Sequence, residues 1–424
     1  MGKMTYEEVT QEILSAPRFK TVPSVVNMKQ YLSYLNHPEK SYQIIHVAGT
    51  NGKGSTCSYL ESILRRQGLK MGLFTSPHLV DMRERMQINR ELVDKELFLE
   101  VYDTVKQVQK ESEFPPLTFF ELILVMALLI FEKEQVDYAI IEAGMGGKSD
   151  ATNALSPVLS IITAVGMDHM QYLGNTLEEI AKEKAGIMKP DVPCVFVDHN
   201  PHVTAIFEEQ ARKSMTPLFQ FSEDSFKIKK IEGKAIDFSL ETRYYINNLL
   251  SVRSKGVYQA ENGSVAAVAA KILFPQLPDS VIEDGLLSAY WPGRMEEIRE
   301  GVIIDGAHNE PSIKAFMNSV KQDGTCGRIL VFAVAADKDY DAMAKDLTED
   351  GCFHTIILTR IPYERMEDPS AIRPVFEQYT KAKIYTEESM EKAIEMAVSM
   401  KKEDDLVYMA GSLYFIGSIF ERML

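Results

Sequence analysis

The sequence has few cysteines, no long apolar run and a deficit of positive charge, and each shortage excludes a class of protein. Its 424 residues include four cysteines that stand far apart, at Cys57, Cys194, Cys326 and Cys352. This spacing argues against a zinc site and against a disulfide framework. The longest apolar run, residues 122–131, is too short to span a bilayer.

The net charge of −15 argues against general binding to nucleic acid or to an anionic membrane. Near the N-terminus, Lys3, Glu7 and Glu8 leave no apolar core of the kind that a signal peptide needs. We therefore expect a cytoplasmic monomer without nucleic-acid or membrane partners. If its ligands are anions, its basic residues must gather locally around them.

The chain is longer than one hydrophobic core normally supports, so two domains are expected. Short β-rich runs alternate with helical stretches from residue 44 to about 197, which predicts a parallel α/β sheet. Alternating runs between residues 218 and 257 predict an antiparallel meander. Residues 290–294 resemble a linker, and a second α/β alternation follows them.

The predicted fold is therefore α/β: a P-loop parallel-sheet ATPase domain with a small antiparallel β section over residues 1–293, and a smaller Rossmann-like domain over residues 294–424. The expected strands are residues 44–48, 71–75, 138–141, 159–164, 194–197, 302–305, 329–333, 355–358, 383–385 and 406–409. The expected helices are residues 55–67, 94–110, 119–133, 177–188, 262–274 and 280–289.

The most informative motif is a glycine-rich loop between the first predicted strand and the first predicted helix. It reads Gly49-Thr50-Asn51-Gly52-Lys53-Gly54-Ser55. This order aims backbone N–H groups and a helix N-terminus at one anion, and Lys53 adds a positive charge. A strict Walker A motif would have glycine in place of Val47 and Ser or Thr in place of Gly54. The motif predicts a variant phosphate loop; the alternative is a glycine-rich turn with a surface lysine.

Polar residues follow other predicted strands of the first domain, at the sheet edge where ligands bind. Glu142 ends one strand, His169 follows another, and Ser76 stands after a third. Oxygens from Ser76 and Glu142 with a nitrogen from His169 would suit a Mg²⁺ that bridges nucleotide phosphates. For His169 alone, a hydrogen-bonded structural role is the alternative. Lys184 lies beside the small residues Ala185 and Gly186, where a backbone can approach closely.

The second domain repeats this pattern. Asp305 and His308 follow its first predicted strand, Ser412 follows its last, and Arg294 lies in the linker. Each alone would be an ordinary strand end. Two such edges across a hinge predict an active site in an interdomain cleft.

Together these segments resemble the folylpolyglutamate synthase/dihydrofolate synthase family, ATP-dependent ligases related to the muramyl amino-acid ligases. Besides the phosphate loop, the resemblance depends on the motifs Thr75-Ser76-Pro77-His78-Leu79, Glu142-Ala143-Gly144-Met145-Gly146-Gly147, Asp150-Ala151-Thr152-Asn153, Asp168-His169, Lys184-Ala185-Gly186-Ile187, Trp291-Pro292-Gly293-Arg294 and Asp305-Gly306-Ala307-His308-Asn309.

The resemblance implies a role for each matching position. Lys53 and the loop residues Gly49, Thr50, Asn51, Gly52, Gly54 and Ser55 would bind ATP, with Asn262, Arg294 and Asp305 as further nucleotide contacts. Ser76, Glu142 and His169 would hold Mg²⁺, and a carbamylated Lys184 would hold a second ion. His308 and Ser412 would contact the incoming glutamate. Lys53, Lys184, Arg294 and His308 would be the catalytic residues.

The implied reaction joins L-glutamate to a reduced folate. A carboxylate does not react with an amine at neutral pH, so ATP first converts it into an acyl phosphate. Residues 21–38 and 81–85 depart from the family pattern, which leaves dihydropteroate open as a second acceptor.

Two alternatives remain, a related ligase and a protein of another class. A muramyl ligase usually carries an extra N-terminal domain, for which too few residues precede the phosphate loop. A nucleotide-switched binding module without ligase activity would need no glutamate pocket, and Asp305, His308 and Ser412 argue against it.

Overall fold

The computed structural model describes residues 4–17, 24–322, 324, 327–363 and 365–423; Lys3, Cys326 and residues 21–23 lie outside these ranges. The chain divides into two compact units. The first unit comprises Met1–Lys227, Asp237–Val252 and Ala260–Tyr290, and the second comprises Ile228–Ile236, Arg253–Gln259 and Trp291–Leu424. The domain boundary between residues 293 and 294 stays a prediction.

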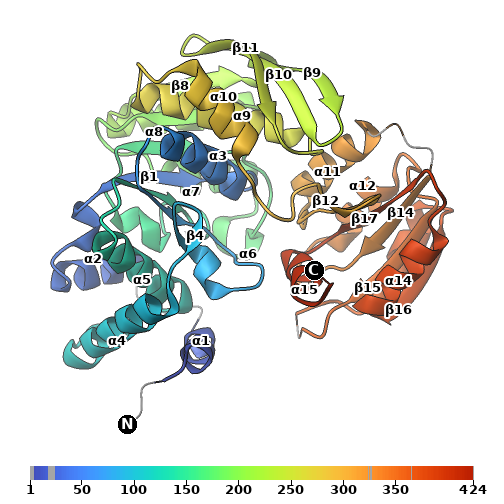
Figure 1. Cartoon of the computed structure of the whole chain (residues 1–424), viewed down its shortest axis with the longest axis horizontal. Coiled ribbons are helices and arrows are strands. Elements are labelled where there is room, and N and C mark those ends of the chain that lie inside the picture. Colours follow the sequence, from blue (N-terminus) through green and yellow to red (C-terminus); the bar gives the residue numbers. More distant parts are fainter. Residues whose placement is uncertain (1–3, 18–23, 323, 325–326, 364, 424) are drawn as a thin grey trace. The chain divides into compact units, whose positions relative to one another are not determined.

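The first unit is built on an eight-stranded sheet with the order β4-β3-β2-β5-β1-β6-β7-β8. Figure 1 labels β1, β4 and β8 of this sheet. All neighbours from β2 to β8 run parallel, whereas β3 and β4 form an antiparallel edge. The strands are β1 (Gln43–Ala48), β2 (Met71–Phe74), β3 (Met86–Ile88), β4 (Glu91–Leu92), β5 (Tyr138–Glu142), β6 (Leu159–Ile162), β7 (Cys194–Asp198) and β8 (Leu218–Ser222).

The helices of this unit follow the apolar periodicity of the sequence. In α4, Phe98, Val101 and Val105 lie on one face and are buried, as the helical repeat requires. In α5, every residue from Glu121 to Phe131 is buried, and Thr118 caps the helix by accepting a hydrogen bond from the backbone N–H of Glu121. The helices are α1 (Tyr6–Ser15), α2 (Ser24–Tyr34), α3 (Lys53–Arg66), α4 (Lys95–Glu111), α5 (Phe119–Lys133), α6 (Met170–Leu173), α7 (Leu177–Ala185), α8 (Pro201–Ser214), α9 (Tyr258–Leu273) and α10 (Asp279–Ser288).

A separate three-stranded sheet, with the order β11-β10-β9, contains β9 (Phe226–Glu232), β10 (Ala235–Glu241) and β11 (Ile246–Val252). The predicted antiparallel section is thus present, but its start at residue 218 is wrong. Leu218–Ser222 form β8, which pairs parallel to β7 and extends the large sheet. A short β-rich run does not reveal which sheet it joins. Likewise, α9 begins at Tyr258, four residues before the predicted start at residue 262.

The second unit contains a six-stranded sheet with the order β12-β13-β17-β14-β15-β16. Its strands are β12 (Glu296–Arg299), β13 (Val302–Ile304), β14 (Gly327–Phe332), β15 (Thr355–Arg360), β16 (Lys383–Ser389) and β17 (Asp405–Ala410). Only β12 pairs antiparallel. Its helices are α11 (Glu310–Gln322), α12 (Tyr340–Thr348), α13 (Pro369–Tyr379), α14 (Met390–Met400) and α15 (Leu413–Met423).

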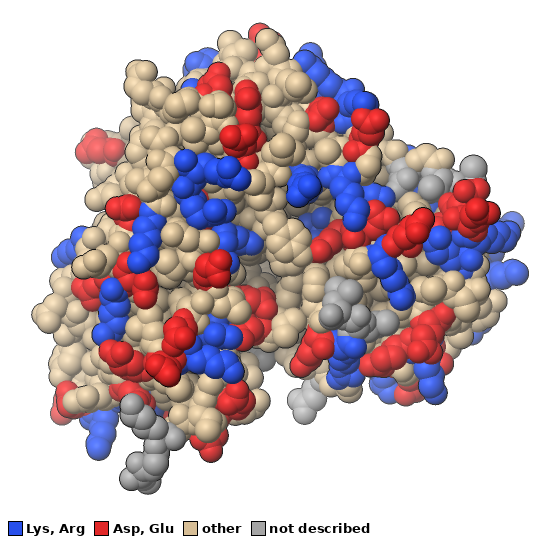
Figure 2. All heavy atoms as spheres, in the orientation of Figure 1, with Lys and Arg blue, Asp and Glu red and all other residues tan. Residues whose placement is uncertain are grey.

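Each unit has its own apolar core, which the sheet and its covering helices share. The core of the second unit includes Ile303, Phe332 and Tyr408, all without exposed surface. Within the described residues, no helix combines the length and the apolar character needed to cross a membrane. Acidic and basic side chains are interspersed over the face that Figure 2 shows.

Candidate active site

The glycine-rich loop joins the end of β1 to the start of α3. Gly52 is the N-cap residue of α3 with φ +84°, and no side chain caps this helix end. The first N–H groups of α3 therefore point out of the loop, together with the positive end of the helix dipole. Among common residues, glycine most easily adopts such a φ.

Neighbouring side chains approach the loop closely. A Cβ atom at Gly49 would lie 1.8 Å from the Oγ1 of Thr163, and one at Gly52 would lie 2.4 Å from the Oδ1 of Asn262. Thr163, which follows β6, also donates a hydrogen bond of 2.7 Å to the carbonyl of Asn51. The structure thus brings Asn262 of α9 against the loop, and its role as a nucleotide contact stays a prediction.

Lys53 turns back over the loop that precedes it. Its ammonium group donates hydrogen bonds of 3.1 Å to the carbonyls of Gly49 and Thr50. The hydroxyl of Thr50 donates to the carbonyl of Gly166 (2.9 Å) and accepts from its N–H (3.0 Å). The bonds of Thr50 fix the loop to the segment after β6, and those of Lys53 keep its charge next to the loop.

The strand order places the predicted metal ligands along the same sheet edge. Because β2, β5, β1 and β6 are neighbours, Ser76, Glu142 and His169 all follow carboxyl ends that flank the loop. The backbone N–H of Ser76 donates to the Oε2 of Glu142 (2.9 Å). Glu142 is only 3% exposed, and a buried carboxylate needs hydrogen bonds or a cation to offset its lost hydration.

His169 lies further out than the other two residues. Its backbone has φ 51°, its side chain is 42% exposed, and its Nε2 lies 3.9 Å from the Oδ2 of Asp168. Among the residues that the structure describes, no group of three or more His, Cys, Asp or Glu side chains could hold a metal ion. The predicted set has only two side chains of these types, so its role as a magnesium site stays a prediction.

Lys184 is buried at the end of α7. It is 2% exposed. Burial, reinforced by the charge of Lys53, lowers its pKa to about 7, although the charges of Asp168, Glu183 and Asp150 oppose this shift. Its amine is therefore largely deprotonated in mildly alkaline water. A neutral amine is the form that reacts with carbon dioxide, so carbamylation is chemically accessible here.

Close backbone contact explains Gly147, one of the glycines after Glu142. A Cβ atom at Gly147 would lie 2.7 Å from the carbonyl oxygen of Glu183 and 3.1 Å from the Cα of Lys184. The N–H of Lys148 donates to that same carbonyl (2.7 Å). The loop after β5 therefore packs directly against the end of α7, which carries Lys184.

Asp150 holds this loop in place, a role that sequence reasoning missed. Its Oδ2 accepts from the N–H of Met145 (2.9 Å) and its Oδ1 from the N–H of Thr152 (3.0 Å). Burial raises the pKa of Asp150, and these hydrogen bonds oppose the increase. The motif Asp150-Ala151-Thr152-Asn153 marks this position in the sequence, but no spacing rule predicts that Asp150 bonds back to Met145.

In the second unit, Asp305 is at the centre of a compact arrangement. Its carboxylate accepts hydrogen bonds from the hydroxyl of Tyr258 (2.6 Å) and from the N–H groups of Met295 and Ala307 (both 2.8 Å). Burial raises the pKa of Asp305, and the nearby charge of Arg294 opposes this effect. Arg294 itself crosses the backbone at Gly306, where a Cβ atom would lie 1.9 Å from its Nη1.

His308 and Ser412 follow the neighbouring strands β13 and β17. The Nδ1 of His308 lies 2.8 Å from the carbonyl of Gly306 and donates to it, which leaves Nε2 as the acceptor of the neutral ring. Ser412 is 3% exposed, and its hydroxyl accepts from the N–H of Tyr414 (3.2 Å). The N–H of Gly411 donates to the carbonyl of Ala307 (2.9 Å), so the two loops are bonded to each other.

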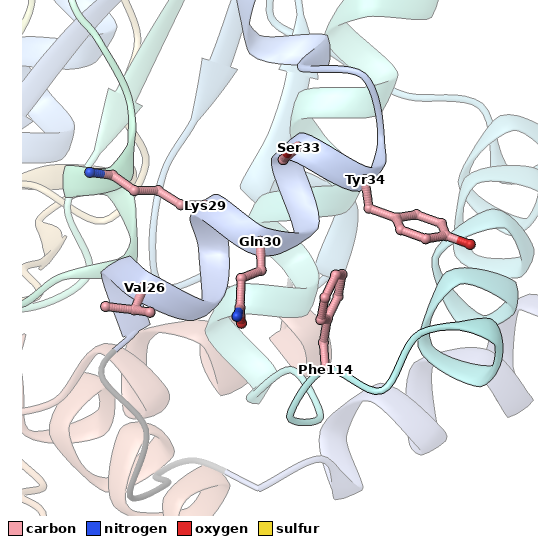
Figure 3. A pocket seen from close by; sticks show the side chains of 6 residues that line it. All are labelled: Val26, Lys29, Gln30, Ser33, Tyr34 and Phe114. Atoms are coloured by element: carbon pink, nitrogen blue, oxygen red, sulfur yellow. The ribbon is translucent and has the colours of Figure 1, made fainter.

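The structure thus gathers the predicted residues within each unit. Those of the first unit surround the glycine-rich loop, and those of the second lie at the carboxyl edge of its sheet. A cavity of about 480 Å³ lies elsewhere, on α2 (Figure 3). It contains none of the predicted site residues: its lining comprises Val26, Lys29, Gln30, Ser33, Tyr34 and Phe114.

Comparison with known proteins identifies the family. The Mur ligase middle domain matches residues 47–270, and the glutamate ligase domain of Mur ligases matches residues 293–413. A dihydrofolate synthase/folylpolyglutamate synthase from Bacillus subtilis is 33% identical over 99% of each chain. The folylpolyglutamate synthase of Lacticaseibacillus casei is 31% identical, again over 99% of each chain.

The chain belongs to the folylpolyglutamate synthase/dihydrofolate synthase family of Mur-type ligases. Solved structures agree with this assignment. A folylpolyglutamate synthase of Mycobacterium tuberculosis complexed with ADP has a TM-score of 0.90, with 25% identity over 98% of this chain and 97% of that one. A complex of such a synthase with AMPPCP and folate has a TM-score of 0.85, with 30% identity over 99% of this chain and 100% of that one.

Proposed function

We propose that this chain is an ATP-dependent ligase that joins L-glutamate to a reduced folate through an amide bond. The observation that carries this proposal is the variant phosphate loop together with two buried residues of the same unit, Lys184 and Glu142. Relatives that match over nearly the whole chain are named folylpolyglutamate synthases and dihydrofolate synthases, which supports the same reaction.

In this proposal, the loop from Gly49 to Ser55 holds the phosphates of ATP. Its uncapped helix end offers N–H donors, and Lys53 supplies charge where the transferred phosphoryl group becomes more negative. Asn262 reaches the same loop. Glu142, Ser76 and His169 would hold Mg²⁺, which when bound supplies positive charge to the phosphates.

Lys184 would act as a carbamate. An unmodified ammonium group would repel a nearby Mg²⁺, whereas a carbamate offers the oxygen ligands that hard cations prefer. A second ion held by this carbamate is part of the proposal. The lowered pKa of Lys184 and its packing against Gly147 support it.

The second unit would supply the groups that act on the nucleotide and on glutamate. Asp305 and Arg294 would contact the nucleotide, while His308 and Ser412 would hold the glutamate that provides the amine. The folate carboxylate attacks the γ-phosphoryl group and forms an acyl phosphate with ADP as product. The glutamate amine then attacks the acyl carbon and releases phosphate.

Dihydropteroate as a second acceptor, a cytoplasmic location and a monomeric state complete the proposal. One assay tests its central claim: ADP release with dihydropteroate or tetrahydrofolate as acceptor, each measured with and without L-glutamate. ADP release that requires both acceptor and glutamate is expected. Release that needs neither would favour a nucleotide-switched module without ligase activity.

A further inference from the structure

His199 bridges two carboxylates that come from different elements of the first unit. It follows β7 directly, and its Nε2 lies 2.9 Å from the Oε1 of Glu261 in the first turn of α9. Its Nδ1 lies 3.2 Å from the Oε2 of Glu223, which follows β8. Both ring nitrogens face acceptors that cannot donate, so the doubly protonated ring satisfies this geometry.

The surroundings of His199 favour its charged form. Burial lowers its pKa, but the hydrogen bonds and charges of Glu261 and Glu223 outweigh this effect and raise the pKa to about 9. Asp198 on β7 accepts a hydrogen bond from Thr204 instead. The two glutamates are therefore the charged groups that act on this ring, and the bridge is charged at neutral pH.

Glu261 precedes the residue that touches the phosphate loop. Asn262 is 6% exposed, and its Oδ1 would meet a Cβ atom at Gly52 at 2.4 Å. Successive helical residues project about 100° apart, so fixing the side chain of Glu261 fixes the rotation of this turn. The direction in which Asn262 points toward the loop is set by that rotation.

We propose that His199 is a positioning residue for the nucleotide: its bridge to Glu261 and Glu223 orients the first turn of α9 so that Asn262 supports the phosphate loop. This inference rests on the proposed function, since it takes the loop to be a nucleotide site. His199 acts through Asn262 and contacts no reacting atom.

The test is the dissociation constant of ADP, measured by calorimetry on the full chain between pH 7 and 10. Because Lys184 loses its proton near pH 7, the wild-type constant is compared with that of His199→Arg at each pH. The ratio of the two constants should stay level up to about pH 8 and increase above pH 9, because a raised pKa preserves the charged bridge until the imidazolium loses its proton. His199→Gln should weaken ADP binding roughly fivefold at pH 7.5, because the charge-assisted contact is lost. The difference from the wild type should shrink above pH 9, where the wild-type bridge loses its charge as well.

His199→Arg distinguishes positioning from a general structural role. Its guanidinium can bridge two carboxylates and does not titrate here, so ADP affinity should stay near wild type with no alkaline loss. Glu223→Gln removes one charge of the bridge and keeps an oxygen that can accept from the Nδ1 of His199. Affinity at pH 7.5 should therefore change less than twofold, while the alkaline loss should begin at a lower pH, because one of the charges that raise the pKa of His199 is gone.

An affinity of His199→Gln equal to that of the wild type at pH 7.5 would overturn the inference and leave the proposed function intact. An alkaline loss that persists unchanged in His199→Arg would overturn it as well, including when His199→Gln fails to fold. If the wild-type protein binds no ADP at any pH, both the proposed function and this inference are wrong.

Discussion

Lys184 is one of the largest fully buried side chains among the residues that the structure describes. An amine on a flexible stem is normally hydrated at the surface, and burying its charge is unfavourable unless it is paired or neutralised. Here the lowered pKa favours the neutral amine. Retaining a lysine at such a position makes chemical sense if the amine is modified.

We expect Lys184 to carry a carbamate in the active protein. Lys184→Ala should lose most activity, and acetate should restore part of it by supplying carboxylate oxygens to the vacated space. Wild-type protein exposed to ¹³C-labelled bicarbonate should show a carbamate carbon by NMR. Lys182→Ala, an exposed lysine on the same helix, is the control and should keep its activity. A labelled signal equally strong in Lys184→Ala would contradict the assignment.

The role of Lys53 can be tested separately from folding. Its side chain is only partly buried and bonds to carbonyls of its own loop, so Lys53→Ala should leave the melting temperature nearly unchanged. Turnover should decrease by roughly 100- to 1000-fold, as expected when one group that stabilises transition-state charge is lost. Steady-state kinetics and thermal unfolding measure the two effects. Activity within twofold of wild type would remove the phosphate-loop assignment.

At the scale of elements, contacts between loop and helix position the site. The loop after β5 contacts the end of α7 because Gly146 and Gly147 have no side chains that would clash with that helix. Asp150 fixes this loop by accepting a hydrogen bond from the N–H of Met145. The phosphate loop is held in the same manner by Thr163. Small residues permit these approaches, and polar side chains from neighbouring segments fix them.

Gly147→Ala should therefore disturb the site through packing alone. The added Cβ atom would meet the backbone of Glu183 at 2.7 Å, which forces α7 and Lys184 away from the loop. We expect a loss of about 1–3 kcal/mol in unfolding free energy and a marked loss of activity. Gly324→Ala is the matched control, since nothing lies within 4 Å of a Cβ atom there. Denaturant unfolding of both variants measures the difference.

The sequence allowed the prediction of elements whose signal is local. The glycine-rich loop between a strand and a helix, the buried helix at residues 119–133 and the parallel strands other than β8 follow from periodicity and glycine placement. The antiparallel edge strands β3, β4 and β12 were not predicted. The sequence could not reveal strand pairing or burial that depends on contacts between residues distant in the chain. Whether residues 218–222 join the large sheet is decided by pairing with β7, and the burial of Lys184 is decided by the loop at Gly147.

At the scale of the whole molecule, two units present polar strand ends of different chemistry. The first gathers the glycine-rich loop with Lys53 and the carboxylate of Glu142, and the second gathers Asp305, Arg294, His308 and Ser412 around adjoining loops. Such a division would suit a reaction that needs a phosphoryl donor and an amine. The groups of the first unit would bind the phosphoryl donor, and those of the second unit would bind the glutamate that provides the amine.

The proposed chemistry predicts where a carboxylate oxygen goes. Attack of the folate carboxylate on the γ-phosphoryl group places one of its oxygens in the bridge between carbon and phosphorus. When the glutamate amine attacks the acyl carbon, the bond between carbon and that oxygen breaks, so phosphate leaves with the oxygen. Folate labelled with ¹⁸O in its terminal carboxylate should therefore yield labelled inorganic phosphate, which mass spectrometry detects. Label in AMP with pyrophosphate as the second product would mean adenylation, and Lys53 and Lys184 would then need another assignment.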